Sequence, residues 1–379
     1  MQYTSFEKAL ADAEDGDTIK LLTDVKVALP NNSGYAYPAV YSIGKSITID
    51  GDNHTFRIDT ANWSKYNDQP TGYFFTVGIE DAYIVPGTNN DVDVTMKNMT
   101  LIGDADYVRA AINAYAPRTL PDGTTADTKL TLENVNIEGF GTYSLGVNNS
   151  DVTVEDCDID NGGWGYAIDV SKATASLTVE SGNIGVISFV DHDSNVQQTG
   201  TINGGHIEDV LVEDEDADVQ ISGGTFDNDV SDYLADGFTL ESYVDENGNT
   251  VYGVTPVYTV TFDSNGGSAV DAQVIKVGEK AVKPADPNRK GYLFQGWYLN
   301  NKPFNFNTAI TEDITLTARW GLIYEPSNLP PRTRSTPSPM WLPPTTSMTQ
   351  FCGPWKWVLP TVPTKTPSAP MPPAPEHRL

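Results

Sequence analysis

Apolar and polar residues alternate along short stretches of this chain, and one such stretch returns many times. In LTLENVNIEG (130–139), Leu130 and Leu132 alternate with polar residues before a Glu-Asn pair, and the alternation then resumes at Val135. A period of two is typical of a strand that buries one face. Similar stretches begin at Val94, Val152, Leu177, Gly200 and Val219, with a looser copy at Ile47. The clear copies begin 36, 22, 25, 23 and 19 residues apart, which predicts a stacked repeat.

The fifth position of each copy breaks the alternation. Gly, Asn and Asp adopt the left-handed backbone conformation most readily, and one such residue turns a strand through a corner. We therefore expect a left-handed corner at this position in every copy, with help from Gly182 beside Ser181. The sixth position, which runs from Met99 to Gly224, then points inward, so the core should narrow toward its C-terminal end. The fifth position holds Asn98, Asn134, Asp156, Ser181, Gly204 and Gly223.

Two or three short strands joined by corners cannot bury an apolar face alone. Coils stacked about 4.8 Å apart enclose a continuous apolar core. We therefore expect an all-β fold over residues 1–257, built on a right-handed parallel β-helix. The second strands of the coils are expected at 107–115, 143–147, 166–170, 185–190 and 209–213.

The two ends of such a stack need covering, because an exposed coil would pair with other chains. At the N-terminal end, residues 6–13 predict a helix, with Thr4 or Ser5 as its N-cap and Gly16 ending it before a strand at 18–22. At the C-terminal end, residues 230–254 contain a hairpin signal, Glu-Asn-Gly-Asn, between two β-rich runs. We expect the helix and the hairpin to close the stack.

Residues 258–320 predict a separate small domain, joined to the stack by a short connection at 254–258, and we expect few contacts to cross between the two parts. Its apolar volume comes from Phe294, Trp297, Tyr298, Phe304, Phe306 and Trp320. Trp297 and Trp320 are also compatible with a platform that stacks against sugars. We favour a role in the core, because a domain this small depends on large aromatic residues to form one.

Two resemblances rest on these motifs. Residues 1–257, beginning with SFEKALADAEDGDTIKLLTDV, resemble the pectin-lyase-like β-helix modules of bacterial secreted and surface proteins. Residues 258–320 resemble a Listeria–Bacteroides (internalin B-type) repeat, through VTFDSNGG, the GY-F-GWY run from Gly291 to Tyr298 and the closing LTARW. The second resemblance implies a small β-grasp-like module of extracellular, cell-attached proteins. The first implies an architecture more than an activity.

The last 59 residues, 321–379, differ in composition from the rest. They hold 15 of the 25 prolines, and five Lys or Arg against two Glu give them a charge of +3. Proline-rich runs neither pair into sheets nor pack a core, so we expect a disordered tail. Two interpretations stay open: a wall-spanning stalk, or an out-of-frame or truncated reading. LPPTT at 342–346 lacks the glycine of a sortase signal, so no anchor is assigned.

The location of the protein is inferred indirectly. No basic and apolar leader follows Met1, so the start is interpreted as trimmed or internal. The scarcity of cysteine, with only Cys157 and Cys352, fits bacterial export without a disulfide framework. With the resemblances, this favours an extracellular or cell-surface protein.

Net charge narrows the class of partner. The chain carries −28, so residues 1–320 without the tail carry −31. Nucleic acids and anionic membranes are bound through Lys and Arg patches, so neither partner, nor membrane insertion, is expected. A host or dietary glycan or a cell-surface protein remains as partner, with Trp164 and Tyr166 as the candidate glycan-binding residues.

An enzyme of the β-helix class is the alternative to a binding protein. Glycoside hydrolysis needs two carboxylates about 5–9.5 Å apart. Asp158 and Asp160 are candidates, since they face outward close to Trp164. The Asn-Thr-Asp, Asp-Asp and Gly-His-Gly motifs of the family's glycosidase branch do not occur. No catalytic residue is therefore assigned.

Acidic clusters one coil apart suggest an optional calcium site. Asp191 and Asp193 precede Asp214 and Asp216 by about one repeat, and oxygen-rich clusters suit Ca²⁺. Solvated acidic corners explain the same pattern. We expect no required cofactor, and calcium is the one optional cofactor that these acidic clusters suggest.

Three functions are consistent with these features. The favoured one is a non-catalytic secreted or surface protein whose β-helix presents an adhesive or glycan-binding surface. The second is a polysaccharide lyase or glycoside hydrolase. The third is a structural spacer that holds another part away from the cell.

Overall fold

The structure is a computed structural model that describes residues 2–27, 39–59, 72–78, 91–116, 126–172, 174–190, 197–213 and 216–323. These residues are mostly β, with one short α-helix, α1 (Phe6–Asp12), and a large sheet that is mixed but largely parallel. The first group of strands is β1 (Thr18–Lys20), β2 (Val25–Val27), β3 (Ala39–Ile43), β4 (Thr48–Ile58), β5 (Tyr73–Val77), β6 (Val92–Ile102), β7 (Ala110–Tyr115), β8 (Thr128–Glu138) and β9 (Tyr143–Asn148).

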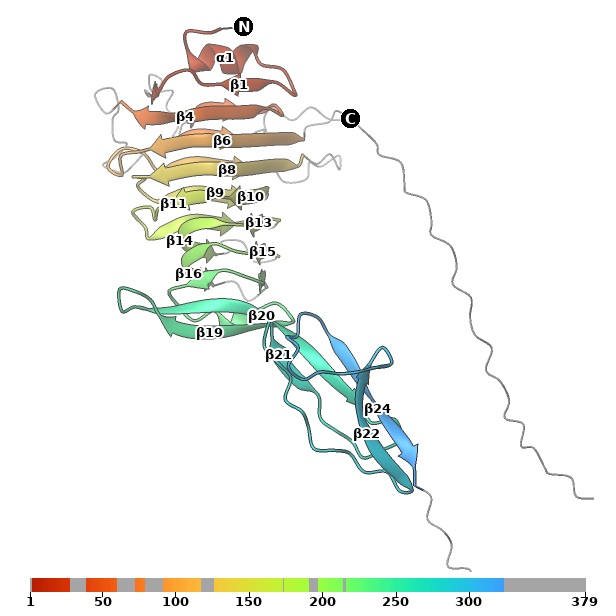
Figure 1. Ribbon diagram of the computed structural model, residues 1–379. Helices are drawn as coiled ribbons and strands as arrows, with labels where there is room; N and C mark the ends of the chain where they lie inside the picture. Colours follow the sequence, from red (N-terminus) through yellow and green to blue (C-terminus); the bar gives the residue numbers. More distant parts are fainter. Residues whose placement is uncertain are drawn as a thin grey trace, which may run out of the picture. The chain divides into compact units, whose positions relative to one another are not determined.

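The next strands continue the same stack, which Figure 1 shows running in chain order from β4 to β16. They are β10 (Asp151–Glu155), β11 (Cys157–Ile159), β12 (Tyr166–Ser171), β13 (Ser176–Val179), β14 (Gly182–Phe189), β15 (Thr199–Ile202), β16 (His206–Val212), β17 (Asp218–Ile221) and β18 (Thr225–Phe226). We call residues 18–226 the coil stack.

The coil stack has three strand faces, each a parallel ladder from coil to coil. Face 1 joins the first halves of β4, β6 and β8 to β10, β13, β15 and β17. Face 2 continues past the corner through β11, the start of β14, the start of β16 and β18. Face 3 joins β3, β5, β7, β9, β12 and the ends of β14 and β16.

The register of these ladders agrees with the sequence repeat. Leu130 pairs with Val94 on one side and with Val152 on the other, and Val135 pairs with Met99. The repeated apolar positions therefore stack directly above one another. Because neighbouring parallel strands lie about 4.8 Å apart, each apolar side chain packs on its equivalents in adjacent coils.

The left-handed corner is confirmed in the first three clear copies. Asn98, Asn134 and Asp156 have φ angles of 53°, 54° and 52°. The Asn134 side-chain amide donates to Asn98 Oδ1 at 3.1 Å, and the Asn98 amide donates to Asp50 Oδ1 at 3.1 Å. Asparagine thus supplies both the backbone conformation and a hydrogen bond to the next coil.

The expected corner position is wrong in the last three copies. There the left-handed residue is one place later, at Gly182, Gly205 and Gly224, with φ of 129°, 93° and 96°. A Cβ atom at Gly182 would lie 2.2 Å from the Cys157 carbonyl oxygen. Glycine occupies these positions because the backbone is left-handed there and the next coil lies very close. We had expected the same glycines to mark a narrowing of the core.

The N-terminal helix forms as expected and packs against the first coils (Figure 1). Its N-cap is Ser5, whose hydroxyl accepts the Lys8 N–H at 3.3 Å. Phe6 is buried with its ring centroid 5.0 Å from Phe56 and 4.8 Å from Tyr41, both edge-on. The helix therefore covers the end of the core with the Phe6 ring, which we call the aromatic plug.

The C-terminal end of the stack is closed by the expected hairpin. It consists of β19 (Phe238–Val244) and β20 (Thr250–Asp263), which pair antiparallel, after a 3₁₀ turn at Ser231–Tyr233. The turn between the strands contains Gly248 with φ 90°, and Asp245 N–H donates to the Asn249 carbonyl. β20 also pairs antiparallel with β18, the last strand of the coil stack.

A second apolar core lies in the segment that we expected to be a small domain. Its strands are the end of β20, β21 (Gln273–Lys276), β22 (Tyr292–Leu299), β23 (Lys302–Pro303) and β24 (Ile314–Leu322). Trp297 is 2% exposed within this core, as we expected, and Trp320 packs half-buried against it. The last strand ends two residues beyond the expected boundary at Trp320, and residues 324–379 lie outside the described residues.

The connection that we expected at 254–258 is instead the middle of β20. Pro256 pairs with Phe238, its carbonyl accepts the Val277 N–H at 3.0 Å, and Val257 N–H donates to Gly237 O at 2.8 Å. The expected connection is therefore part of a continuous, paired strand. One strand belongs to the hairpin at its start and to the second core at its end.

Replacing Asn134 tests the corner. Asn134→Val forces a β-branched residue into the left-handed region and removes the hydrogen bond to Asn98, so we expect a loss of more than about 1 kcal/mol of unfolding free energy. Asn134→Gly keeps the backbone conformation and should lose less. Thermal or denaturant unfolding of the two variants measures the difference, and equal stabilities would contradict the corner assignment.

Replacing Phe6 tests the aromatic plug. Phe6→Ala removes a buried ring from the contacts with Tyr41 and Phe56, so we expect a loss of about 3–5 kcal/mol in urea unfolding. Leu22→Ala is the control, because Leu22 lies in the same region but is 64% exposed. Equal stabilities of the two variants would show that α1 does not close the core.

Thiol reactivity tests the placement of Cys157 in the core. Cys157 is 2% exposed, and burial raises the pKa of its thiol to about 11. In a Cys352→Ser variant we expect no reaction with a thiol reagent near pH 8 until the protein is unfolded, because the thiolate is the reactive species. Rapid reaction of the folded variant would place Cys157 at the surface.

Candidate functional site

A groove of about 480 Å³ opens on face 3 of the coil stack. Five of the residues that line it are aromatic side chains, and most of the others carry amide, hydroxyl or charged groups. We call it the face-3 groove. Its lining residues are Tyr73, Arg109, Asn113, Tyr115, Tyr143, Asn148, Trp164, Tyr166, Asp169, Ser171, Lys172, Val190 and Glu213.

The tyrosines of the groove are placed by the register of face 3. Tyr143 at the start of β9 pairs with Tyr166 at the start of β12, and Tyr73 at the start of β5 pairs with Ala110. Burial, and then the neighbouring Tyr73, raise the pKa of Tyr143 well above its ordinary value. Tyr143 therefore keeps its phenol proton at neutral pH and can donate a hydrogen bond.

Trp164 stands on a tight turn between β11 and β12, the second and third strands of one coil. The indole side chain is 61% exposed, although its backbone N–H donates to the Thr142 carbonyl at 3.0 Å. Gly165 has φ 92°, and a Cβ at Gly162 would lie 2.2 Å from the Thr142 carbonyl oxygen. The turn is thus held against the preceding coil and presents the tryptophan at the edge of the groove.

Arg109 lies against two of these rings. Its guanidinium carbon is 5.2 Å from the centroid of Trp164 and 5.8 Å from that of Tyr143, within the range of cation–π attraction. Its backbone is fixed as well, because its carbonyl accepts both the N–H and the hydroxyl of Thr142. The arginine therefore helps to hold the exposed indole in place.

A ladder of amides and hydroxyls crosses the groove in the direction of stacking. Asn148 Nδ2 donates to Asn113 Oδ1 at 2.8 Å, and Ser171 Oγ donates to Asn148 Oδ1 at 2.8 Å. Gly146 lies between Asn113 and Asp169 in register, and a Cβ there would come within 2.9 Å of the Tyr143 ring. The glycine therefore leaves room for the Tyr143 ring.

This combination of side chains suits a carbohydrate. Aromatic faces stack against the apolar faces of sugar rings, while amides and hydroxyls can hydrogen-bond to sugar hydroxyls. The charged lining residues are two cations, Arg109 and Lys172, and two carboxylates, Asp169 and Glu213. Since these charges balance, the groove does not select strongly for the charge of a ligand.

The structure brings together the two residues predicted for glycan contact, and adds others. Trp164 and Tyr166 both line the groove. Sequence reasoning missed Tyr73, Tyr143 and the Asn113–Asn148–Ser171 ladder. Asn113 and Tyr143 lie in predicted second strands, and Asn148 and Ser171 each directly follow one. No strand was predicted at Tyr73. Which face they share became visible only with the register.

The two catalytic candidates, Asp158 and Asp160, lie elsewhere. Asp158 on β11 is exposed on face 2, where its carboxylate accepts the Asn183 amide at 3.1 Å. Asp160 is exposed, and its carbonyl accepts the Ser144 hydroxyl at 2.6 Å. Neither residue is among those that line the face-3 groove.

The calcium hypothesis cannot be placed in the structure, since Asp191, Asp193 and Asp214 lie outside the described residues. Asp216 is described and exposed. Within the described part of the chain, no three His, Cys, Asp or Glu side chains gather closely enough to hold a metal ion.

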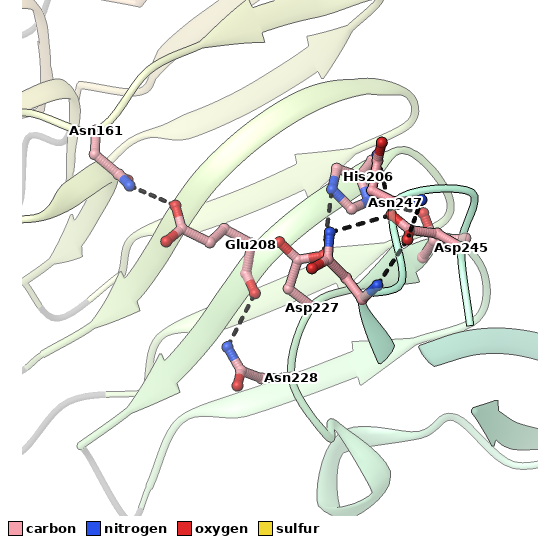
Figure 2. A network of polar contacts seen from close by, with 9 residues as sticks. Asn161, His206, Glu208, Asp227, Asn228, Asp245 and Asn247 are labelled. Carbon is pink, nitrogen blue, oxygen red and sulfur yellow. Dashed lines mark hydrogen bonds and ion pairs between the residues drawn. The ribbon is translucent and has the colours of Figure 1, made fainter. Parts of the chain in front are cut away.

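A second polar network lies on face 2 near the C-terminal end of the stack (Figure 2). Asn161 accepts the Val186 N–H at 2.7 Å and donates to Glu208 at 2.6 Å, so one amide links three coils. His206 Nδ1 lies 3.0 Å from Thr225 Oγ1, and its Nε2 lies 3.5 Å from Asp227 Oδ1. We interpret these polar contacts as interactions that stabilise the stacking of neighbouring coils.

No helix among the described residues is long and apolar enough to cross a membrane. This finding concerns helical spans in that part of the chain alone.

Comparison with known proteins identifies both parts of the chain. Residues 1–204 match the family described as "Putative pectate lyase-like adhesive domain", and residues 258–319 match the Listeria-Bacteroides repeat domain. These matches agree with both resemblances and are consistent with a cell-surface location.

Two proteins of Evansella cellulosilytica are similar over a short segment. One carries the name "Putative membrane protein" and is 40% identical over 68 residues, which are 17% of this chain and 10% of that protein. The other, "Putative Gly-rich membrane protein", is 38% identical over 68 residues, 17% of this chain and 8% of that protein. The chain thus spans about a tenth of the length of the curated relatives it matches. From the family match over its first 204 residues, the chain belongs to the pectate lyase-like adhesive domain family.

Proposed function

We propose that this protein is a non-catalytic adhesin of the cell surface or extracellular space, which binds glycans through the face-3 groove. In this proposal the coil stack is a right-handed parallel β-helix, and it serves as a rigid support for the groove. The partner is a host or dietary glycan, free or carried on a cell-surface protein. We do not expect nucleic acid or anionic membrane as partners, because the charge of −31 over residues 1–320 disfavours both.

The observation that carries the proposal is the exposed indole of Trp164. A large aromatic side chain that is 61% exposed loses the burial energy that tryptophans usually contribute. Here it is held in position by Arg109 and by a turn fixed to the preceding coil. A positioned, exposed ring beside Tyr166 is what stacking against a sugar requires.

Rigidity of the groove supports binding as well. The lining residues come mostly from β5, β7, β9 and β12, whose backbones are paired in register on face 3. A site on paired strands loses little conformational freedom when a ligand binds. A neutral or weakly charged saccharide fits best, since the charged lining groups balance.

A polysaccharide lyase or glycoside hydrolase is the second candidate. One observation favours it: the carboxylates of Asp169 and Glu213 line the same groove as the basic residues Arg109 and Lys172. Carboxylates and basic groups are the residue types that both reactions use. Reducing-sugar release or an unsaturated product, lost in Asp169→Asn or Glu213→Gln, would establish catalysis and contradict the non-catalytic proposal.

A glycan array probed with the full chain tests the binding proposal. We expect the parent protein to bind a defined set of saccharides, and Trp164→Ala to weaken that binding about tenfold or more because the stacking surface is removed. Tyr243→Ala is the matched control, since Tyr243 is an aromatic residue that is 49% exposed outside the groove. It should bind as the parent does.

Unfolding curves of both variants accompany the array, because the exposed Trp164 should be replaceable without loss of stability. Equal binding by Trp164→Ala and the parent would remove the face-3 groove as the site. If the parent protein binds no glycan on the array and releases no product in the activity assays, the structural-spacer function would be favoured.

A further inference from the structure

A second groove, of about 510 Å³, lies within the Listeria-Bacteroides repeat. It is formed by β22, β24 and the turns beside them, and it shares no residue with the face-3 groove. We call it the repeat groove. Its lining residues are Asn265, Arg289, Tyr292, Tyr298, Asn300, Asn301, Thr315, Thr317, Ala318, Arg319 and Trp320.

The guanidinium groups of two arginines of the repeat groove lie over aromatic rings. The Arg319 guanidinium carbon is 4.2 Å from the centroid of Tyr298. That of Arg289 is 4.0 Å from the centroid of Tyr292 and 6.0 Å from that of Trp320. A guanidinium carries five N–H donors in a planar fork, and this arrangement matches a carboxylate or sulfate.

The arrangement is fixed by its own hydrogen bonds. Arg289 Nη1 donates to the Asn265 carbonyl at 2.9 Å, and Trp320 Nε1 donates to the Ser264 carbonyl at 2.9 Å. Tyr298 faces Thr317 across the β22–β24 pair, and Gly296 faces Arg319. Tyr298 and Arg319 therefore come from neighbouring strands of one sheet.

The charge of the repeat groove contrasts with the rest of the chain. It is lined by two arginines and no carboxylate, although the whole chain carries −28. The nearest acidic residue in register, Asp263, pairs with Thr317, but its carboxylate accepts the Asn265 N–H at 2.8 Å. The face-3 groove, by comparison, has two carboxylates against its two cations.

The other lining groups are those of a saccharide site. Asn300, Asn301, Thr315 and Thr317 provide amides and hydroxyls, and Tyr292 and Tyr298 are half-buried rings at the same surface. An acidic peptide bound by strand addition would need an unpaired strand edge. β24, which carries Arg319, is paired on both sides, with β20 and β22.

We propose that the repeat groove binds an anionic polysaccharide, with Arg289 and Arg319 contacting its carboxylate or sulfate groups. The proposal is independent of the face-3 groove. The protein would then carry two saccharide sites of different charge preference, one on each apolar core.

Binding of charged and neutral dextrans to the full chain tests this proposal. The probes are dextran sulfate, carboxymethyl-dextran and unmodified dextran on a biosensor surface, at about 0.15 M salt. We expect binding to at least one charged dextran and none to unmodified dextran. Attraction of so acidic a chain to a polyanion would require a local cationic site.

Three double variants locate the site. Arg289→Gln with Arg319→Gln should weaken binding about tenfold or more, because two charge-assisted contacts are lost. Lys280→Gln with Lys283→Gln removes the same charge from the same repeat, outside the groove, and should change the affinity less than about twofold. Arg289→Lys with Arg319→Lys keeps the charge and the fold but removes the planar guanidinium, and should bind more weakly than the parent.

Three results would overturn the proposal. They are no binding of the parent to either charged dextran, equal weakening by the arginine and lysine double variants, and binding of polyglutamate with no binding of the dextrans. The last result would assign the groove to an acidic peptide. The arginine variants should keep the glycan-array binding that depends on Trp164. This result distinguishes a failure of the repeat-groove proposal from a failure of the adhesin proposal.

Discussion

Parallel pairing of one coil with the next, in register, is the interaction on which the rest of the coil stack depends. It requires each turn of the chain to return to the same lateral position, about 4.8 Å further along. A left-handed residue at the corner makes this possible, as Asn134 or Gly182 does in its own coil. Because the coils share one apolar core, an error of one residue would move buried side chains to the surface.

Register also explains how the candidate site is built. Residues about one repeat apart in sequence become neighbours in space, so a recurring polar residue becomes a ladder. Asn113, Asn148 and Ser171 form such a ladder inside the face-3 groove. Asn98 and Asn134 form another at the corner, where the same kind of amide contact stabilises the backbone. Residue type alone therefore does not distinguish a ladder that binds a ligand from one that stabilises the backbone. The exposed aromatic rings beside the ladder in the face-3 groove make that distinction.

Much of the fold was predictable because the local patterns have a direct physical meaning. Period-two alternation gave the strands, Ser5 gave the start of α1, and the Asn-Gly turn gave the hairpin. The later corners were misplaced by one residue, since two glycines in a row give no local sign of which one turns. The continuity of β20 through Pro256 was also missed, because only the pairing with neighbouring strands shows that a strand continues through this proline. The groove depended on pairings between coils, which only the register reveals.

The most direct test of the account is a cross-link that reports the register of two coils. Thr131 on β8 pairs with Thr153 on β10, and both side chains are partly exposed on face 1. In a Cys352→Ser background, Thr131→Cys with Thr153→Cys should form a disulfide on mild oxidation, because paired Cα atoms lie within the range of about 4.4–6.8 Å that the bond allows. Thr131→Cys with Glu155→Cys, two residues out of register, should not. Preferential cross-linking of the second pair, or equal cross-linking of both, would contradict the stacking on which both the core and the face-3 groove rest.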